Sequence, residues 1–268
     1  MSADPGAGTG ELPRHRLSGE GGPPVVLLNG AGARLGYWSR VQPDLAPIAA
    51  TLAYDRRVPE NPGRADFGAA TIEELRGLAA ALGLAPPWIL VAHSMGGLYA
   101  NLHARLFPDE VAGVVLVDAT HPEQERRFAP GANLSTRGLR AAVALWDRLL
   151  GPGAMTEVVR LEAIADEIRR APAFPAIPLT VVTAGIAPPR WQVPAHLWEI
   201  HLANQRELAA LSPLGRQVVA GRSNHYIPRR QPQIVVEAVR GMVAGLRGEG
   251  SGDAPGARSS GRPHHRDP

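Results

Sequence analysis

Cysteine is absent from this 268-residue chain. The chain therefore has no disulfide, no thiolate nucleophile and no zinc or iron–sulfur site built on cysteine. Lysine is absent as well, because all 28 of the basic residues other than histidine are arginine. Without lysine, Schiff-base chemistry, attachment of pyridoxal phosphate and the phosphate-binding lysine of a P-loop are all excluded.

Several patterns that would identify a partner are missing too. No run reaches 18 apolar residues, and the first residues lack the apolar centre of a signal peptide, so we expect no membrane span and a cytoplasmic protein. The net charge of +3 is scattered, without a basic stripe, which gives no support for a nucleic-acid partner. Neither a dinucleotide-binding glycine motif nor a metal-ligand cluster is present, so we expect no cofactor, no metal and a small-molecule substrate. The oligomeric state is not predicted.

Composition divides the chain into three parts. Residues 1–11 are small, polar and glycine-rich, and residues 248–268 contain almost no apolar side chain, so both ends are predicted to be disordered. The two histidines of the tail, His264 and His265, are interpreted as part of that flexible segment rather than as metal ligands. We expect residues 12–247 to form one domain.

Apolar runs alternate with helical patterns along this domain. The helix expected at 71–84 opens on Thr71 and Glu74, which have the spacing of a capping box. This alternation predicts an α/β fold with a mostly parallel sheet and helices on both faces, and ligands in such folds bind at the carboxyl ends of the strands. Strands are expected at 24–30, 50–55, 88–93, 111–119, 178–185 and 217–221, and further helices at 95–107, 195–211 and 231–247.

The segment most informative about chemistry is WILVAHSMGGLYANLHARLF, residues 88–107. A buried strand leads into a serine, two glycines and a helix, which is the context of a nucleophile elbow. The turn requires small residues two positions before and after the nucleophile, and Ala92 and Gly96 stand there. Alanine replaces the first glycine of the usual G-x-S-x-G signature. We predict that Ser94 is a nucleophile at a helix N-terminus, where the helix dipole favours developing negative charge.

The region 24–128 resembles the α/β-hydrolase fold family, above all in HSMGGLYA and FPDEVAGVVLVDATHPEQ. The resemblance extends more weakly through SNHYIP and implies a serine hydrolase whose chain order is nucleophile, acid, histidine. It also implies that haloalkane dehalogenase and epoxide hydrolase mechanisms are disfavoured, because these need a carboxylate where Ser94 stands.

The family pattern places the general base in the polar loop after the last strand, where His225 lies. His93 is expected to point away from the reaction centre, and His201 is interpreted as packing or pocket lining. Many members of the family carry the acid after the strand that follows the insert, but here that strand ends in TAGIAPPRWQ, which contains no carboxylate. Asp118, after the preceding strand, is the first candidate, since a buried aspartate needs a partner. Glu199 is the second candidate and Glu123 the third.

The resemblance also implies an oxyanion hole formed by two backbone N–H groups. One belongs to Met95, directly after the nucleophile. The other belongs to Ala31, in a loop that reads Asn29-Gly30-Ala31-Gly32 where the family often has His-Gly-x-Gly. The insert at about 120–176 resembles a helical cap, with helical patterns at 139–150 and 155–171, and predicts a partly apolar pocket.

Three classes of function fit these features. The first is hydrolysis of a carboxylic ester, thioester or lactone through an acyl-enzyme on Ser94. The second is a carbon–carbon hydrolase or lyase that uses the same triad, although such lyases normally use a lysine that this chain lacks. The third is a ligand-binding protein that retains the elbow without catalysis. The identity of the substrate is not predicted, because one fold supports many chemistries.

Overall fold

The computed structural model describes residues 11–57, 66–128 and 160–248, and all structural statements refer to these. The predicted terminal segments, apart from residues 11 and 248, and the helix expected at 139–150 lie outside them. The described chain forms a seven-stranded sheet in the order β1-β3-β2-β4-β5-β6-β7, in which only β1 is antiparallel to its neighbour. The strands are β1 (His15–Ser18), β2 (Val25–Leu28), β3 (Thr51–Tyr54), β4 (Trp88–His93), β5 (Val111–Val117), β6 (Leu179–Ala184) and β7 (Gly215–Ala220).

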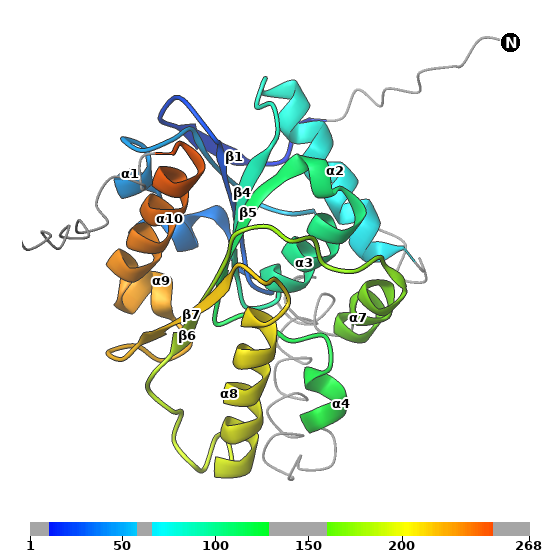
Figure 1. Ribbon diagram of the computed structural model, residues 1–268, viewed down its shortest axis with the longest axis vertical. Helices are drawn as coiled ribbons and strands as arrows, with labels where there is room; N and C mark the ends of the chain where they lie inside the picture. The colour runs from blue at the N-terminus through cyan, green and yellow to red at the C-terminus, as the bar shows by residue number, and fades with distance from the viewer. Residues whose placement is uncertain (1–10, 58–65, 129–159, 249–268) are drawn as a thin grey trace, which may run out of the picture.

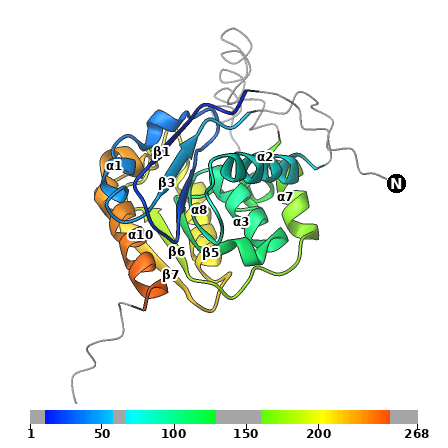
Figure 2. The ribbon, with the colours of Figure 1, turned by 90° about the horizontal axis from the view of Figure 1, so that it is seen from above.

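Helices cover both faces of this sheet, as the sequence predicts (Figure 1). Strands β2 to β6 are almost wholly buried, and alternate residues contribute to two apolar clusters, one on each face. The cluster on one face is packed against α2, α3 and α7, and the other against α1 and α10 (Figure 2). The helices are α1 (Gln42–Leu45), α2 (Phe67–Ala81), α3 (Gly96–Leu106), α4 (Gln124–Phe128), α7 (Leu161–Arg170), α8 (Ala195–Ala209), α9 (Ile227–Arg230) and α10 (Pro232–Leu246), with 3₁₀ turns η1 (Leu35–Trp38) and η2 (Pro108–Glu110).

The strand order places the expected site at a topological switch point. From β2 the chain continues to β3 on one side, whereas β4, β5, β6 and β7 follow in order on the other side. In sheets of this kind the loops after the two central strands diverge and leave room for a ligand at their carboxyl ends. The loop after β2 and the turn after β4 are therefore expected to form the centre of the site.

The capping box predicted at Thr71 is wrong. Helix α2 begins four residues earlier, at Phe67, and the Thr71 hydroxyl donates to the Phe67 carbonyl from inside the helix. The carboxylate of Glu167, on α7, accepts hydrogen bonds from the N–H groups of Gly68 and Ala69, at 2.7 and 2.9 Å. A side chain distant in sequence thus satisfies donors at the helix start that a local cap would otherwise satisfy.

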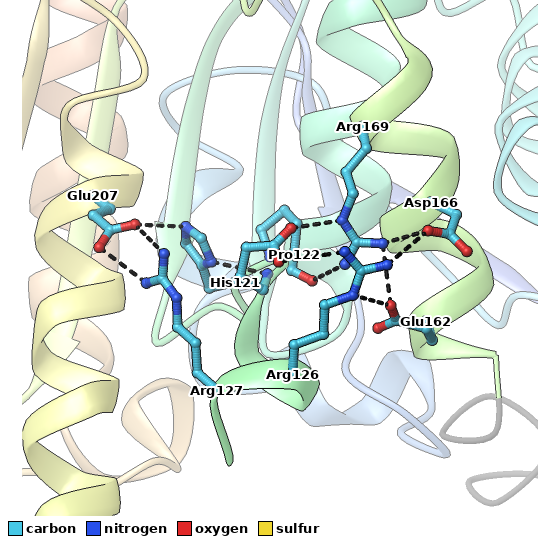
Figure 3. Close-up of polar contacts among 9 residues, drawn as sticks. His121, Pro122, Arg126, Arg127, Glu162, Asp166, Arg169 and Glu207 are labelled. Carbon is cyan, nitrogen blue, oxygen red and sulfur yellow. Dashed lines mark hydrogen bonds and ion pairs between the residues drawn. The ribbon is translucent and has the colours of Figure 1, made fainter. Parts of the chain in front are cut away.

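The two described ends of the insert are joined by an ion-pair cluster (Figure 3). Arg169, on α7, donates to the Glu123 carboxylate at 2.6 Å, to Glu162 at 3.1 Å and to Asp166. Arg126, on α4, donates to Glu162 at 2.7 Å as well. The start of the insert is therefore fixed to its end, although Arg126 and Glu162 are 36 positions apart in the sequence. No helix in the described part of the chain is long and apolar enough to cross a membrane.

We expect the substitution Arg169→Met to lower the free energy of unfolding by about 1–2 kcal/mol, because three carboxylates lose a shared partner in a partly exposed network. The hydrogen bond from Arg169 is the main cause that lowers the pKa of Glu123. This stabilisation is therefore present above the ordinary glutamate pKa and is lost as the pH falls through the lowered value. Urea unfolding at several pH values measures it. The exposed neighbour Arg170→Met is the control, and an equal loss in both variants would contradict the assignment.

Candidate active site

Ser94 occupies a strained turn between β4 and α3. Its φ of 54° lies in the left-handed region, which non-glycine residues rarely adopt. The turn is fixed on both sides, because the Ser94 N–H donates to the Val117 carbonyl at 3.2 Å and the Ser94 carbonyl accepts from Thr120 N–H at 3.0 Å. Ala92 fits the position two residues before it, fully buried in β4 between β2 and β5. The alanine of the A-H-S-M-G sequence is therefore compatible with the elbow.

The loop after β2 packs directly against this turn. A Cβ atom built on Gly30 would lie 3.2 Å from the Cβ of Ser94, and one on Gly96 would lie 2.5 Å from the carbonyl oxygen of Leu28. Glycine at these positions allows the two backbone segments to approach closely. Ala31 directly follows Gly30, and Met95 directly follows Ser94. Both residues therefore lie at the same edge of the sheet as Ser94.

The side chain of Asn29 and the carbonyl groups of the loop after β2 are hydrogen-bonded, although asparagine stands where the family often has histidine. Asn29 donates its amide to the Tyr54 carbonyl at 2.9 Å and accepts from the Trp38 indole at 2.6 Å. Arg56, after β3, donates to the carbonyls of Asn29 and Gly30 at 2.7 and 3.3 Å. These contacts hold the loop in place, and the role of Arg56 was not predicted from the sequence.

Asp118, directly after β5, is hydrogen-bonded to His225. The Nδ1–H group of His225 donates to Oδ2 of Asp118 at 2.7 Å, which leaves Nε2 of the neutral ring as an acceptor. The aspartate side chain is 2% exposed and the histidine side chain 45% exposed. Burial opposes ionisation of Asp118, but hydrogen bonds from His201 and His225 outweigh it and hold the pKa of this carboxyl well below its usual range.

His93 lies behind His225 in the interior. Its Nε2–H group donates to the backbone carbonyl of His225 at 2.9 Å, and the two ring centroids are 4.6 Å apart. The Tyr37 hydroxyl oxygen lies 3.2 Å from the same nitrogen. Burial, and then the charge on His225, lower the pKa of His93 to about 3, so this ring stays neutral at ordinary pH. His93 thus supports the loop that carries His225.

The structure separates the three acid candidates. Asp118 contacts His225, whereas Glu199 is exposed on α8 and Glu123 binds Arg169 in the ion-pair cluster. His201, interpreted from the sequence as packing or pocket lining, donates instead to Asp118. No sequence signal indicates this contact, because the two residues are 83 positions apart. Among the described residues, no group of three or more His, Cys, Asp or Glu side chains is placed to hold a metal ion.

Comparison with known proteins agrees with this architecture. An esterase from Thermogutta terrifontis superposes with a TM-score of 0.60 at 23% identity, over 87% of this chain and 93% of that one. A haloalkane dehalogenase variant from Bradyrhizobium elkanii superposes with a TM-score of 0.62 at 17% identity, over 88% of this chain and 93% of that one. At these identities the likeness concerns the fold alone.

Sequence comparison places the chain in a family. An uncharacterised protein of Schizosaccharomyces pombe is 33% identical over 87 residues, which cover 31% of this chain but only 16% of the yeast protein. The model of the alpha/beta hydrolase fold family matches residues 23–170, more than half of the chain. This chain therefore belongs to the α/β-hydrolase fold family.

Proposed function

We propose that the protein is a serine hydrolase that cleaves a carboxylic ester, thioester or lactone through an acyl-enzyme on Ser94. One observation carries this proposal: the buried Asp118 carboxylate holds His225 in the tautomer whose Nε2 accepts a proton. That tautomer is the one a serine hydroxyl needs from its general base. Support comes from the strained turn at Ser94 and from the hydrogen bond between the Thr120 N–H and the Ser94 carbonyl.

In the proposed reaction, Oγ of Ser94 attacks the substrate carbonyl carbon while its proton passes to Nε2 of His225. The carbonyl π electrons move to the oxygen, and the N–H groups of Met95 and Ala31 stabilise the resulting oxyanion. When the tetrahedral intermediate collapses, the bond to the leaving group breaks and His225 returns the proton to that group. Water then attacks the acyl-enzyme with the same base, which releases the acid and restores Ser94.

A serine nucleophile separates this proposal from some structural relatives. The matched Bradyrhizobium protein is a haloalkane dehalogenase, and such enzymes attack carbon with a carboxylate. Here the corresponding turn carries Ser94, and the nearby Asp118 carboxylate is buried and accepts three hydrogen bonds. An acyl substrate therefore fits these residues better than an alkyl halide.

Labelling with a fluorophosphonate probe tests the proposal without knowledge of the substrate. We expect one adduct per chain, mapped by peptide mass spectrometry to Ser94, since the probe reacts with serines that are activated by a base. p-Nitrophenyl esters from acetate to palmitate then define the preferred acyl length. A folded protein that the probe does not label, and that hydrolyses none of these esters, would favour the ligand-binding alternative.

A further inference from the structure

The Asp118 carboxylate accepts hydrogen bonds from two histidines rather than one. His225 donates to Oδ2 at 2.7 Å, and Nε2–H of His201 donates to Oδ1 at 3.0 Å. The backbone N–H of Ala184 also donates to Oδ1, at 2.9 Å. Because these donors approach both oxygens, they leave the carboxylate little freedom to rotate. The buried acid is thus oriented by donors from both β6 and α8.

Helix α8 holds the turn after β5 through two side chains on one face. His201 and Gln205 are one helical turn apart, and Gln205 donates its amide to the Ala119 carbonyl at 2.7 Å. The Trp198 ring stacks on His201, with centroids 5.0 Å apart and an angle of 23° between the planes. His201 is itself only 13% exposed at its side chain. The ring of His201 is therefore fixed by packing as well as by the hydrogen bond. Helix α8 itself packs against β6 and β7 (Figure 1).

We infer that His201 is a positioning residue of the proposed triad, which acts on His225 through their shared carboxylate. This inference rests on the proposed serine hydrolase function. By donating to Oδ1, His201 fixes the rotamer of Asp118 in which Oδ2 faces His225.

Three other titratable side chains around this carboxylate keep one protonation state near neutral pH. His93, on β4, is neutral because burial and the charge on His225 lower its pKa to about 3. Burial is the main cause that raises the pKa of Tyr37, on η1, far above its usual value, against the opposing charge of Arg229. Burial and then Arg127 lower the pKa of His121, beside Glu207, to about 4. These three side chains therefore stay neutral near neutral pH and add no charge to the surroundings of Asp118.

Two substitutions at position 201 test the orienting effect. His201→Phe removes the donor and the titratable ring, and we expect kcat for p-nitrophenyl butyrate to fall about 10-fold. His201→Gln keeps an amide donor near the position of Nε2, so kcat should return to within about threefold of the wild type.

The control is His196→Gln, at an exposed histidine on the same helix, which should retain the wild-type kcat. Lower thermal stability in both His201 variants, with unchanged kcat, would overturn the inference and leave His201 a packing residue. Failure of the proposed function is a distinct result. In that case the wild type would show neither labelling at Ser94 nor turnover that Ser94→Ala abolishes, whatever residue stands at position 201.

Discussion

The substitution Ser94→Ala is expected to lower kcat for ester hydrolysis by at least about 10⁴-fold, because covalent catalysis cannot begin without the nucleophile. The loss should appear in kcat rather than in KM, since the methyl group of alanine leaves the surroundings of the turn unchanged. Fluorophosphonate labelling should disappear in the same variant. The measurements are steady-state rates with p-nitrophenyl butyrate and labelling followed by intact mass.

The matched control is Ser39→Ala, at an exposed serine directly after η1, which should retain full activity and labelling. Ser94→Gly adds a test of the turn itself. It should be as inactive as Ser94→Ala but more stable than that variant by about 1 kcal/mol, because glycine adopts a φ of 54° without strain. Hydrolysis that persists in both variants would show that another residue is the nucleophile.

Features encoded by contiguous residues were predicted well from the sequence. The strand, turn and helix of residues 88–107 form β4, the turn at Ser94 and α3 because a buried strand, small residues and a helical pattern follow each other without interruption. The parallel sheet follows from the alternation of strands and helices. Strand β1 was missed because its four residues, HRLS, include no buried residue and pair only at the edge of the sheet.

Features that depend on distant residues were not predictable in this way. The N-terminal cap of α2 comes from Glu167, 99 positions from Gly68, and the local spacing of Thr71 and Glu74 therefore indicated the wrong helix start. The contact of His201 with Asp118 spans 83 positions and has no local signature. Such contacts follow from how α7 and α8 pack on the sheet, and a single sequence carries little information about that packing.

The second large effect is expected for Asp118→Asn, which should lower kcat by about 10³- to 10⁴-fold. The reason lies in the donors around the side chain. The N–H of Ala184 can only donate, and it lies 2.9 Å from Oδ1, so the single carbonyl oxygen of asparagine is best placed there. Its NH₂ group then faces His225 and stabilises the tautomer in which Nδ1 accepts and Nε2 carries the proton. That tautomer cannot accept the proton of Ser94.

Asparagine is a suitable probe because it tolerates the left-handed φ of 45° at position 118. The backbone of the turn should therefore survive, and nitrogen-15 NMR of the imidazole should show the exchanged tautomer. The matched control is Glu199→Gln, whose exposed carboxylate on α8 was the second acid candidate, with kcat expected within about twofold of the wild type. Near-normal turnover in Asp118→Asn together with a loss of several orders of magnitude in Glu199→Gln would identify Glu199 as the acid instead.

The pH dependence of stability gives an independent check on the same carboxylate. Burial raises the pKa of Asp118, but the hydrogen bonds from His201 and His225 lower it more, to a value well below that of an unfolded aspartate. A group with a lowered pKa in the folded protein stabilises the fold above its ordinary pKa and loses that effect as the pH falls. Wild type should therefore be more stable than Asp118→Asn at pH 7, and the difference should shrink as the pH is lowered below about 4. If the difference in unfolding free energy between the two proteins stays constant across this range, the charge of Asp118 does not stabilise the folded protein. The pairing of that charge with both histidines would then not contribute to stability either.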